Sequence, residues 1–302
     1  MRIHKTAFVV VTVLCCALAV LAQTEAKPKL KLTLDEFFNS VYFTAGEISP
    51  DGNAVVIGTE RADWDQQIFR DDLWLYRDDS KGGALVPLTQ SGHDSEPKWS
   101  PDGRWIAFLS ERKSSAEKSG DSDDPDSSAK DESVSQIYLI SPNGGEAVAL
   151  TQGDEGVHAF AWSADSQTIY FATRQPWTNA QKDAYKKEWK DVVQYRSAER
   201  GDTIFALDVG AAIARDSTPA FGTADSEKDD KPGAAPGAVE IAQTLLRIDR
   251  LFPSPDGASL GFLTNAINQR EEKYENIEIY TLALPVSRRA LDQTGTPSPP
   301  AR

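Results

Sequence analysis

One tight-turn motif recurs along this chain and constrains its fold more than any other feature. In the stretch "WSPDGRWIAFLSER" the turn is Ser-Pro-Asp-Gly, and related turns begin at Ser49, Ser100, Ser163 and Ser254. Proline fixes φ, aspartate bonds the neighbouring backbone and glycine accepts a positive φ, so the motif predicts a tight turn between two strands. The copy at residues 163–166 reads Ser-Ala-Asp-Ser. Because it lacks both Pro and Gly, we expect this turn to be less tightly specified.

The residues that follow each turn predict strands buried on both faces. Residues 105–109 read Trp-Ile-Ala-Phe-Leu, a continuous apolar run, whereas a half-exposed strand would alternate apolar and polar residues. Further strands are predicted in each repeat at residues 73–76, 85–88, 137–140, 147–150, 203–207 and 277–282. Four strands per repeat, in one order, are typical of a β-propeller blade. The fold class is therefore all-β, a propeller of four-stranded blades.

Three insertions separate the repeats. Residues 113–133 are rich in Ser, Asp and Lys, and residues 222–238 are rich in Gly, Ala, Asp and Lys, so both predict disordered loops. Residues 178–200 predict a helical insertion, because Tyr185, Trp189 and Val192 recur at helical spacing. The acidic residues of the first loop do not follow the calcium-binding EF-hand pattern, which needs a glycine at a fixed place.

The first residues have the composition of a secretory signal peptide. Arg2 and Lys5 precede a mostly apolar run, and residues 20–22 form a small-residue cleavage site, so we expect residues 1–22 to be removed. An uncleaved N-terminal anchor is the alternative reading. Cleavage would remove Cys15 and Cys16, both cysteines of the chain, and would leave no stable membrane span. The expected location is periplasmic or extracellular.

The charge of the chain excludes one class of partner. Asp and Glu number 46 against 32 Lys and Arg, which gives a formal net charge of −14. Such a protein repels nucleic-acid phosphates, so no nucleic-acid partner is expected. The sequence predicts neither a cofactor nor a metal site.

The hairpins "WSPDGRWIAFLSER" and the element "QIYLISPNGGEAVALTQ" resemble TolB-type propeller repeats. The segment "RQPWTNAQKDAYKKEWKDVVQYRSAERGDTIFALDV" and the order of elements around it are similar to the N-terminal propeller of exported prolyl oligopeptidase-family serine peptidases, the acylaminoacyl-peptidase and dipeptidyl-peptidase group. The resemblance covers most of residues 34–284. It implies that a propeller controls access of peptides to an α/β-hydrolase domain with a Ser-Asp-His triad.

No catalytic residue of that family can be placed in this sequence. A nucleophile elbow requires G-x-S-x-G, which does not occur in the 302 residues. After signal cleavage two histidines remain, His93 and His158, and we expect local hydrogen bonds for both. Glu271 and Glu272 could hold a substrate amine as the paired glutamates of dipeptidyl-peptidase relatives do, but a solvated hairpin tip explains them equally well. We therefore expect no catalytic, cofactor or metal residue here.

The visible repeats predict an incomplete propeller. About four blades fall within residues 34–284, the last without a fourth strand, and residues 285–302 form a polar, Pro-rich tail. Exposed blade edges favour association with other proteins. Two functions follow: the substrate-gating or binding propeller part of an exported peptidase, inactive alone, which meets peptides when joined to a hydrolase domain; or a TolB-like envelope propeller that acts through protein contacts.

Overall fold

The computed structural model describes residues 31–78, 82–112, 134–153, 155–178, 180, 200–216, 236–265 and 277–284. The chain divides into two compact units, Met1–Ser40 and Val41–Arg302. The first unit contributes one short helix, α2 (Leu34–Phe38). Its N-terminus is closed by a capping box, in which the Glu36 backbone N–H donates to Thr33 Oγ1 at 3.1 Å and the Thr33 backbone N–H donates to Glu36 Oε2 at 2.9 Å.

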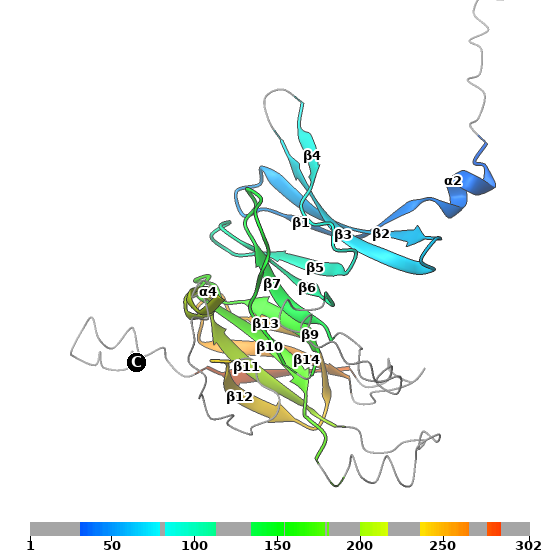
Figure 1. Ribbon diagram of the computed structural model, residues 1–302. Coiled ribbons are helices and arrows are strands. Elements are labelled where there is room, and N and C mark those ends of the chain that lie inside the picture. The colour runs from blue at the N-terminus through cyan, green and yellow to red at the C-terminus, as the bar shows by residue number, and fades with distance from the viewer. Residues whose placement is uncertain are drawn as a thin grey trace, which may run out of the picture. The chain divides into compact units, whose positions relative to one another are not determined.

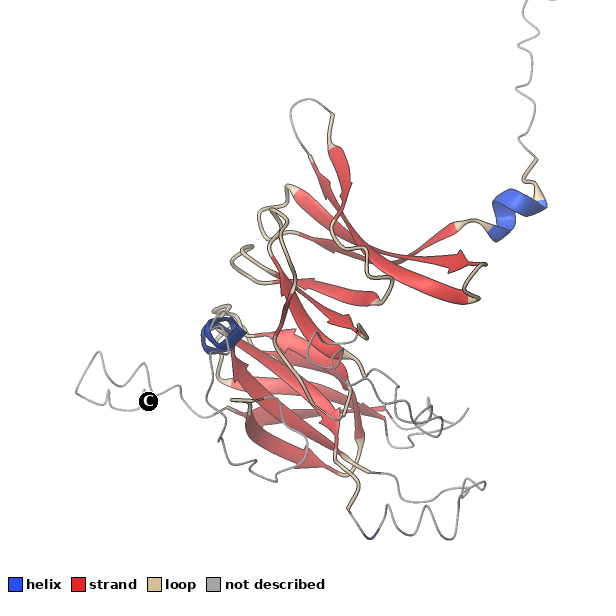
Figure 2. Ribbon diagram, viewed as in Figure 1, coloured by secondary structure: helices blue, strands red, loops and turns tan. Residues whose placement is uncertain are grey.

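The second unit is built from antiparallel sheets that follow one another along the chain (Figures 1 and 2). The first blade has the strands β1 (Val41–Ile48), β2 (Ala54–Asp63), β3 (Ile68–Arg77) and β4 (Ala84–Pro87). The second blade has β5 (Asp94–Trp99), β6 (Ile106–Ser110), β7 (Gln136–Ile140) and β8 (Val148–Ala149). The third has β9 (Val157–Trp162), β10 (Thr168–Arg174), β11 (Asp202–Asp208) and β12 (Val239–Thr244), and the fourth has β13 (Arg247–Pro253), β14 (Ser259–Asn265) and β15 (Ile277–Ala283).

Strand order within each sheet follows the chain, apart from the direction in which it is counted, so every blade is a simple meander. Each strand predicted from the sequence lies in one of these sheets, and the predicted all-β, propeller-type architecture is confirmed. The fourth sheet has three strands among the described residues.

The four turns share one hydrogen-bond pattern. In the second blade, Ser100 Oγ donates to Asp102 Oδ1 at 2.6 Å and accepts from the Trp105 backbone N–H at 3.0 Å. The same two bonds occur at Ser49, Ser163 and Ser254. The expectation of a looser third turn is therefore wrong for its bonding. Ser166 takes the glycine's place there with φ of 61°, a left-handed conformation that is unusual for a residue with a side chain.

Successive blades are joined by three hydrophobic clusters. The first lies between the first and second blades, the second between the second and third, and the third between the third and fourth. Strand β6 is buried along its whole length because its alternate side chains enter two different clusters. Ile106 and Phe108 pack toward the first blade, while Ala107 and Leu109 pack toward the third. This confirms that the run at residues 105–109 is buried on both sides, with Trp105 only half-buried.

One helix was not expected from the sequence. Helix α4 (Val209–Asp216) follows β11 directly, and Asp208 Oδ1 accepts a hydrogen bond from the Ala211 backbone N–H at 2.8 Å near its start. Its residues Val209 and Ala212 are buried in the cluster between the second and third blades.

Several predicted segments lie outside the described residues. They are the signal peptide 1–22, the loop 113–133, the tail 285–302, nearly all of the helical insertion 178–200 and the loop 222–238 up to residue 235. These remain predictions.

Candidate functional site: the inner strands

We call the first strand of each sheet its inner strand, because first strands of neighbouring blades contact one another, and tryptophan links them. Strand β1 contacts β5, and β9 contacts β13. The Trp99 indole N–H donates to the Glu47 carbonyl at 3.0 Å, and the Trp162 indole N–H donates to the Lys98 carbonyl at 3.2 Å. Both tryptophans immediately precede a turn serine, and each bonds to the equivalent carbonyl of the preceding blade. The tryptophan of the repeated motif therefore forms a hydrogen bond between neighbouring blades.

Lys98, whose carbonyl accepts the Trp162 bond, also makes a side-chain contact with the third blade. Its ammonium donates to the Phe160 carbonyl at 2.6 Å and lies 4.4 Å from the centre of the Phe160 ring. Burial lowers the pKa of Lys98, while the nearby Glu96 and Glu47 carboxylates oppose that change and Arg250 reinforces it. The amine therefore bonds the second blade to the third and lies within the field of charges on three inner strands.

Glu96 and Arg250 are exposed, as is Glu47. Glu96 and Arg250 occupy the same place in their repeats, each four residues before a turn serine. Glu96 has φ of 49°, and the β5–β6 register shifts between Ser95 and Lys98. A non-glycine residue in the left-handed region is uncommon, and such bulges re-aim a side chain. The bulge places an exposed carboxylate beside the half-buried lysine, with an exposed guanidinium acting on the same lysine.

A second polar cluster joins the third blade to the fourth. Asp202 is fully buried, and its Oδ2 lies 2.7 Å from His158 Nε2 and accepts from the Ile248 backbone N–H at 2.6 Å. Arg174 Nε lies 3.5 Å from its other oxygen. A histidine bonded to a buried aspartate has two members of a hydrolytic triad, but here the aspartate also receives a backbone N–H and an arginine. These contacts make it an anchor for β13.

The residues considered from the sequence fall into three groups. His158 makes the local bond expected for it, and His93 is exposed, with its backbone N–H donating to Ser91 Oγ at 3.1 Å. Ser100 and Asp102 are turn residues that bond each other. Glu271 and Glu272 lie outside the described residues, so their role stays a prediction.

Among the described residues, no group of three or more His, Cys, Asp or Glu side chains is placed to hold a metal ion. No helix in the described part of the chain is long and apolar enough to cross a membrane.

Glu96, Lys98 and Arg250 were not singled out from the sequence. The signal that could have found them is their position in the repeat, because other blades carry apolar residues at some of the same places. Ala45 and Ala159 are the counterparts of Glu96 and Arg250, and Ala161 is a counterpart of Lys98. A charge at a repeat position where another blade carries an apolar residue marks a departure from the architectural role.

No family model matches the chain. A 142-residue stretch is 30% identical to the "Uncharacterized peptidase YuxL" of Bacillus subtilis (strain 168). This stretch covers 47% of the chain and 19% of YuxL. This sequence similarity confirms the predicted relationship to the propellers of such peptidases. The chain thus spans about a fifth of the length of the curated relative it matches.

Solved structures with a similar arrangement include the acylaminoacyl peptidase of Pyrococcus horikoshii, with a TM-score of 0.47, 13% identity, and coverage of 82% of this chain and 31% of that one. They also include TolB from Acinetobacter baumannii, with a TM-score of 0.38, 12% identity, and coverage of 81% of this chain and 41% of that one.

Proposed function

We propose that these blades are the substrate-binding and substrate-gating propeller part of an exported serine peptidase of the prolyl oligopeptidase type, acting in the periplasm or outside the cell. In this proposal peptide hydrolysis belongs to an α/β-hydrolase domain, and the described blades bind and admit the peptide. The observation that carries it is the 30% identity to the peptidase YuxL over 142 residues.

The chemistry of the inner strands supports peptide binding. A short peptide carries an ammonium at one end and a carboxylate at the other. Glu96 offers an exposed carboxylate to the first and Arg250 an exposed guanidinium to the second, both by charge-assisted hydrogen bonds. Lys98 is already bonded to the Phe160 carbonyl, so we assign it the role of holding the two strands in place.

The test is a binding measurement with fluorescent peptides. A set of labelled tri- to hexapeptides is titrated with the full chain, and fluorescence anisotropy gives the Kd. We expect Glu96→Gln and Arg250→Gln each to weaken binding by about tenfold, the order expected for one charge-assisted hydrogen bond. Glu240→Gln, on the outer strand β12, is the matched control and should leave the Kd unchanged. Peptides that bind equally well to all four proteins would contradict this site.

A labelling experiment addresses catalysis separately. Because the sequence contains no G-x-S-x-G, we expect a fluorophosphonate probe to leave the purified chain unlabelled. Stoichiometric labelling of one serine would overturn the assignment of hydrolysis to another domain.

The alternative is a TolB-like envelope propeller that acts through protein contacts. The observation in its favour is that the first and fourth blades carry exposed apolar side chains, such as Phe43 and Ile279. Absence of peptide binding, together with formation of a defined complex with an envelope protein that Phe43→Asp abolishes, would favour this second function.

A further inference from the structure

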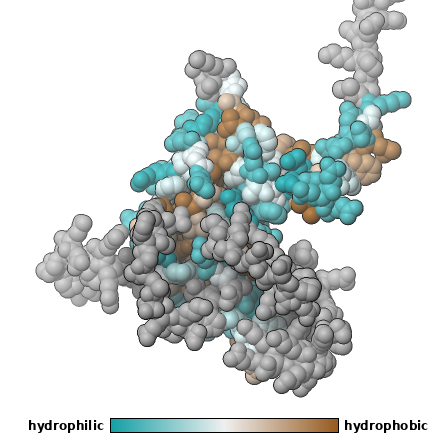
Figure 3. Space-filling model, viewed as in Figure 1, coloured by the Kyte–Doolittle hydropathy of each residue, from teal (hydrophilic) through white to brown (hydrophobic). Residues whose placement is uncertain are grey.

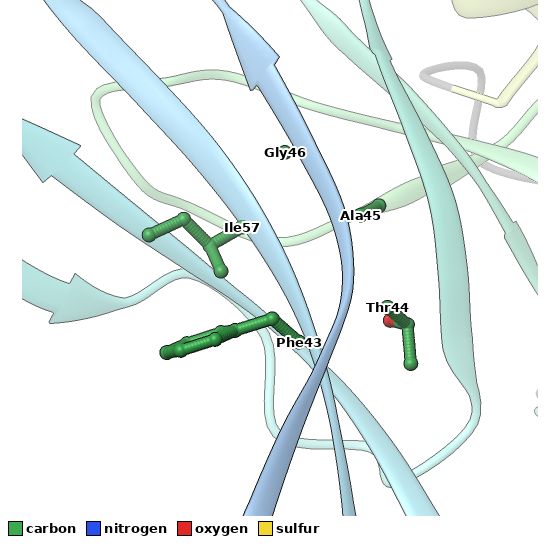
Figure 4. A pocket seen from close by; sticks show the side chains of 5 residues that line it. All are labelled: Phe43, Thr44, Ala45, Gly46 and Ile57. Carbon is green, nitrogen blue, oxygen red and sulfur yellow. The ribbon is translucent and has the colours of Figure 1, made fainter.

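The first blade has an apolar face on which no other blade of the described part of the chain packs. Phe43 is 79% exposed and Leu85 56% exposed, and hydrophobic surface is visible over this sheet (Figure 3). Figure 4 shows Phe43 and Ile57 projecting to the same side of the sheet. A groove of about 560 Å³ lies on this face. We call it the first-blade face, and its apolar lining residues are Val41, Phe43, Ile57, Trp74, Leu85 and Pro87.

The fourth blade has an apolar face on its far side. Ile279 is 75% exposed, Ile277 50% and Phe252 49%. The register pairs Leu263 with Ile279, and residues two apart on a strand share a side, so Ile277 lies on the same face. Phe252 pairs with Gly261, which shares this side with Leu263. We call this surface the last-blade face, formed by Phe252, Gly261, Leu263, Ile277 and Ile279.

The interfaces between blades follow a rule of shape. The side of a blade that is turned to the preceding blade carries a stacked aromatic pair across its second and third strands. The ring centres of these pairs are 5.9 Å apart for Phe108 and Tyr138, 5.3 Å for Phe171 and Phe205, and 5.5 Å for Phe262 and Tyr280. Each pair is directly opposite in the register.

The opposite side of each blade carries smaller aliphatic residues. Ala107 pairs with Leu139 on the side of the second blade turned to the third, and Ala172 pairs with Ile204 on the side of the third turned to the fourth. A bulky pair therefore packs against small side chains at both interfaces, as dense interiors require.

The two uncovered faces are the two halves of one more such interface. Ile57 lies at the same distance from its turn serine as Phe108, Phe171 and Phe262, and it pairs with Trp74. This is the bulky pair of the first blade. The last-blade face offers Gly261 and Leu263 at the places that hold Ala107 and Leu109 in the second blade. One chain thus carries both complementary surfaces.

We propose that the last-blade face of one copy of this chain packs on the first-blade face of a second copy, repeating the packing found between its own blades. The contact is heterologous, because two different surfaces meet, so it either closes into a ring or continues head to tail. It would bury apolar area that a monomer leaves in water and cover the strand edges of the outer sheets.

The test measures the mass of the full chain in solution by light scattering during gel filtration, at concentrations from about 1 to 100 μM. We expect assemblies of two or more copies. Phe43→Asp and Ile279→Asp each place a charge at the contact and should weaken association about 100-fold, since an unpaired buried charge is costly. Both side chains are more than 70% exposed, so both variants should fold. Circular dichroism checks this.

Val239→Asp, on the outer strand β12 and 63% exposed, is the matched control and should associate as the unaltered chain does. An equimolar mixture of the Phe43→Asp and Ile279→Asp proteins retains one intact pair of faces and should recover a species of two copies. A monomer at every concentration would overturn the proposal. That result is expected if further blades of a longer polypeptide cover these faces. Dissociation by Phe43→Asp alone would also overturn it, because that result means that two first-blade faces meet.

Discussion

The second and third blades differ from the first and fourth although all four follow the same repeat. In the second blade the first strand, β5, is exposed at one position only, whereas the equivalent strand of the first blade, β1, is exposed at all but one position. The reason is the number of neighbouring blades among the described residues: the second and third blades pack on two sides, and the first and fourth on one. The same turn and strand pattern thus yields a core in one place and an apolar surface in another. Stability and association should divide along this line.

The largest expected difference concerns the aromatic pairs. Phe108 is fully buried, and Phe108→Ala should lower the free energy of unfolding by about 4 kcal/mol. Phe262 holds the equivalent place in the fourth blade but is only half-buried, so Phe262→Ala should cost roughly 2 kcal/mol. Urea denaturation followed by tryptophan fluorescence measures both. Equal losses would show that the outer blade is as tightly packed as the inner one.

The next prediction compares two buried aspartates. Asp202 bonds His158 in its own blade and the Ile248 backbone in the fourth, while Asp94 bonds Ser110 and Arg112, both within its own blade. Either Asp→Asn change removes a buried charge from its partners and should cost about 3 kcal/mol.

Hydrogen exchange distinguishes the two aspartates. Asp202→Asn should speed amide exchange in β13, because its bond to the Ile248 N–H weakens, and Asp94→Asn should leave that strand unchanged. Faster exchange of β13 in both variants would mean that the fourth blade depends on global stability and not on this anchor.

A smaller effect is expected at the tryptophan bonds between inner strands. Trp99→Phe removes the indole N–H that donates to Glu47 and should cost about 1 kcal/mol. Trp162→Phe removes the same bond and also atoms from a nearly fully buried ring, so the loss should be about 2 kcal/mol. Thermal unfolding of both variants ranks them, and a larger loss for Trp99→Phe would contradict the ranking of the two tryptophans by burial.

The sequence predicted the repeat, the strands and the doubly buried run at residues 105–109 because these depend on local pattern. A turn motif and an apolar strand are readable from a few neighbouring residues. It predicted a looser third turn because Pro and Gly are missing there, yet the serine and aspartate at Ser163 and Asp165 carry the bonds, and these were retained. The sequence reasoning assigned no element to residues 209–216 and so missed α4, whose Val209 and Ala212 pack in the cluster between the second and third blades.

The candidate site was less accessible to sequence reasoning. Glu96, Lys98 and Arg250 are far apart in the chain, and only the packing of inner strands brings their charges into one field. The Asp202 anchor likewise joins residues of three strands and two blades. Neither arrangement has a local signature, because long-range pairing decides which charged side chains meet and which are solvated.

The smallest predicted effect lies in the turns and depends on pH. The hydrogen bond from Ser254 lowers the pKa of Asp256 below its usual value of 3.8, and the bond from the Ala258 N–H adds to this. A carboxyl group whose pKa is lower in the folded state stabilises the fold above the unfolded pKa and loses that contribution as pH falls through the folded pKa. Asp256→Asn should therefore be slightly less stable than the unaltered chain at pH 7, and the two should converge below about pH 3.

The Ser49–Asp51 turn of the first blade sharpens this test, because its serine bond also lowers the pKa of Asp51. Asp51→Asn should show the same convergence in urea denaturation midpoints measured between pH 7 and pH 2.5, and Glu240→Gln, a surface change on the outer strand β12, serves as the control. Asp51 also accepts a hydrogen bond from the Asn53 side chain at 3.2 Å, which further lowers its pKa, so its pH-dependent difference should be the larger of the two. Parallel curves for Asp256→Asn and the unaltered chain at every pH would mean that the Ser254 bond is as strong to an amide oxygen as to a carboxylate.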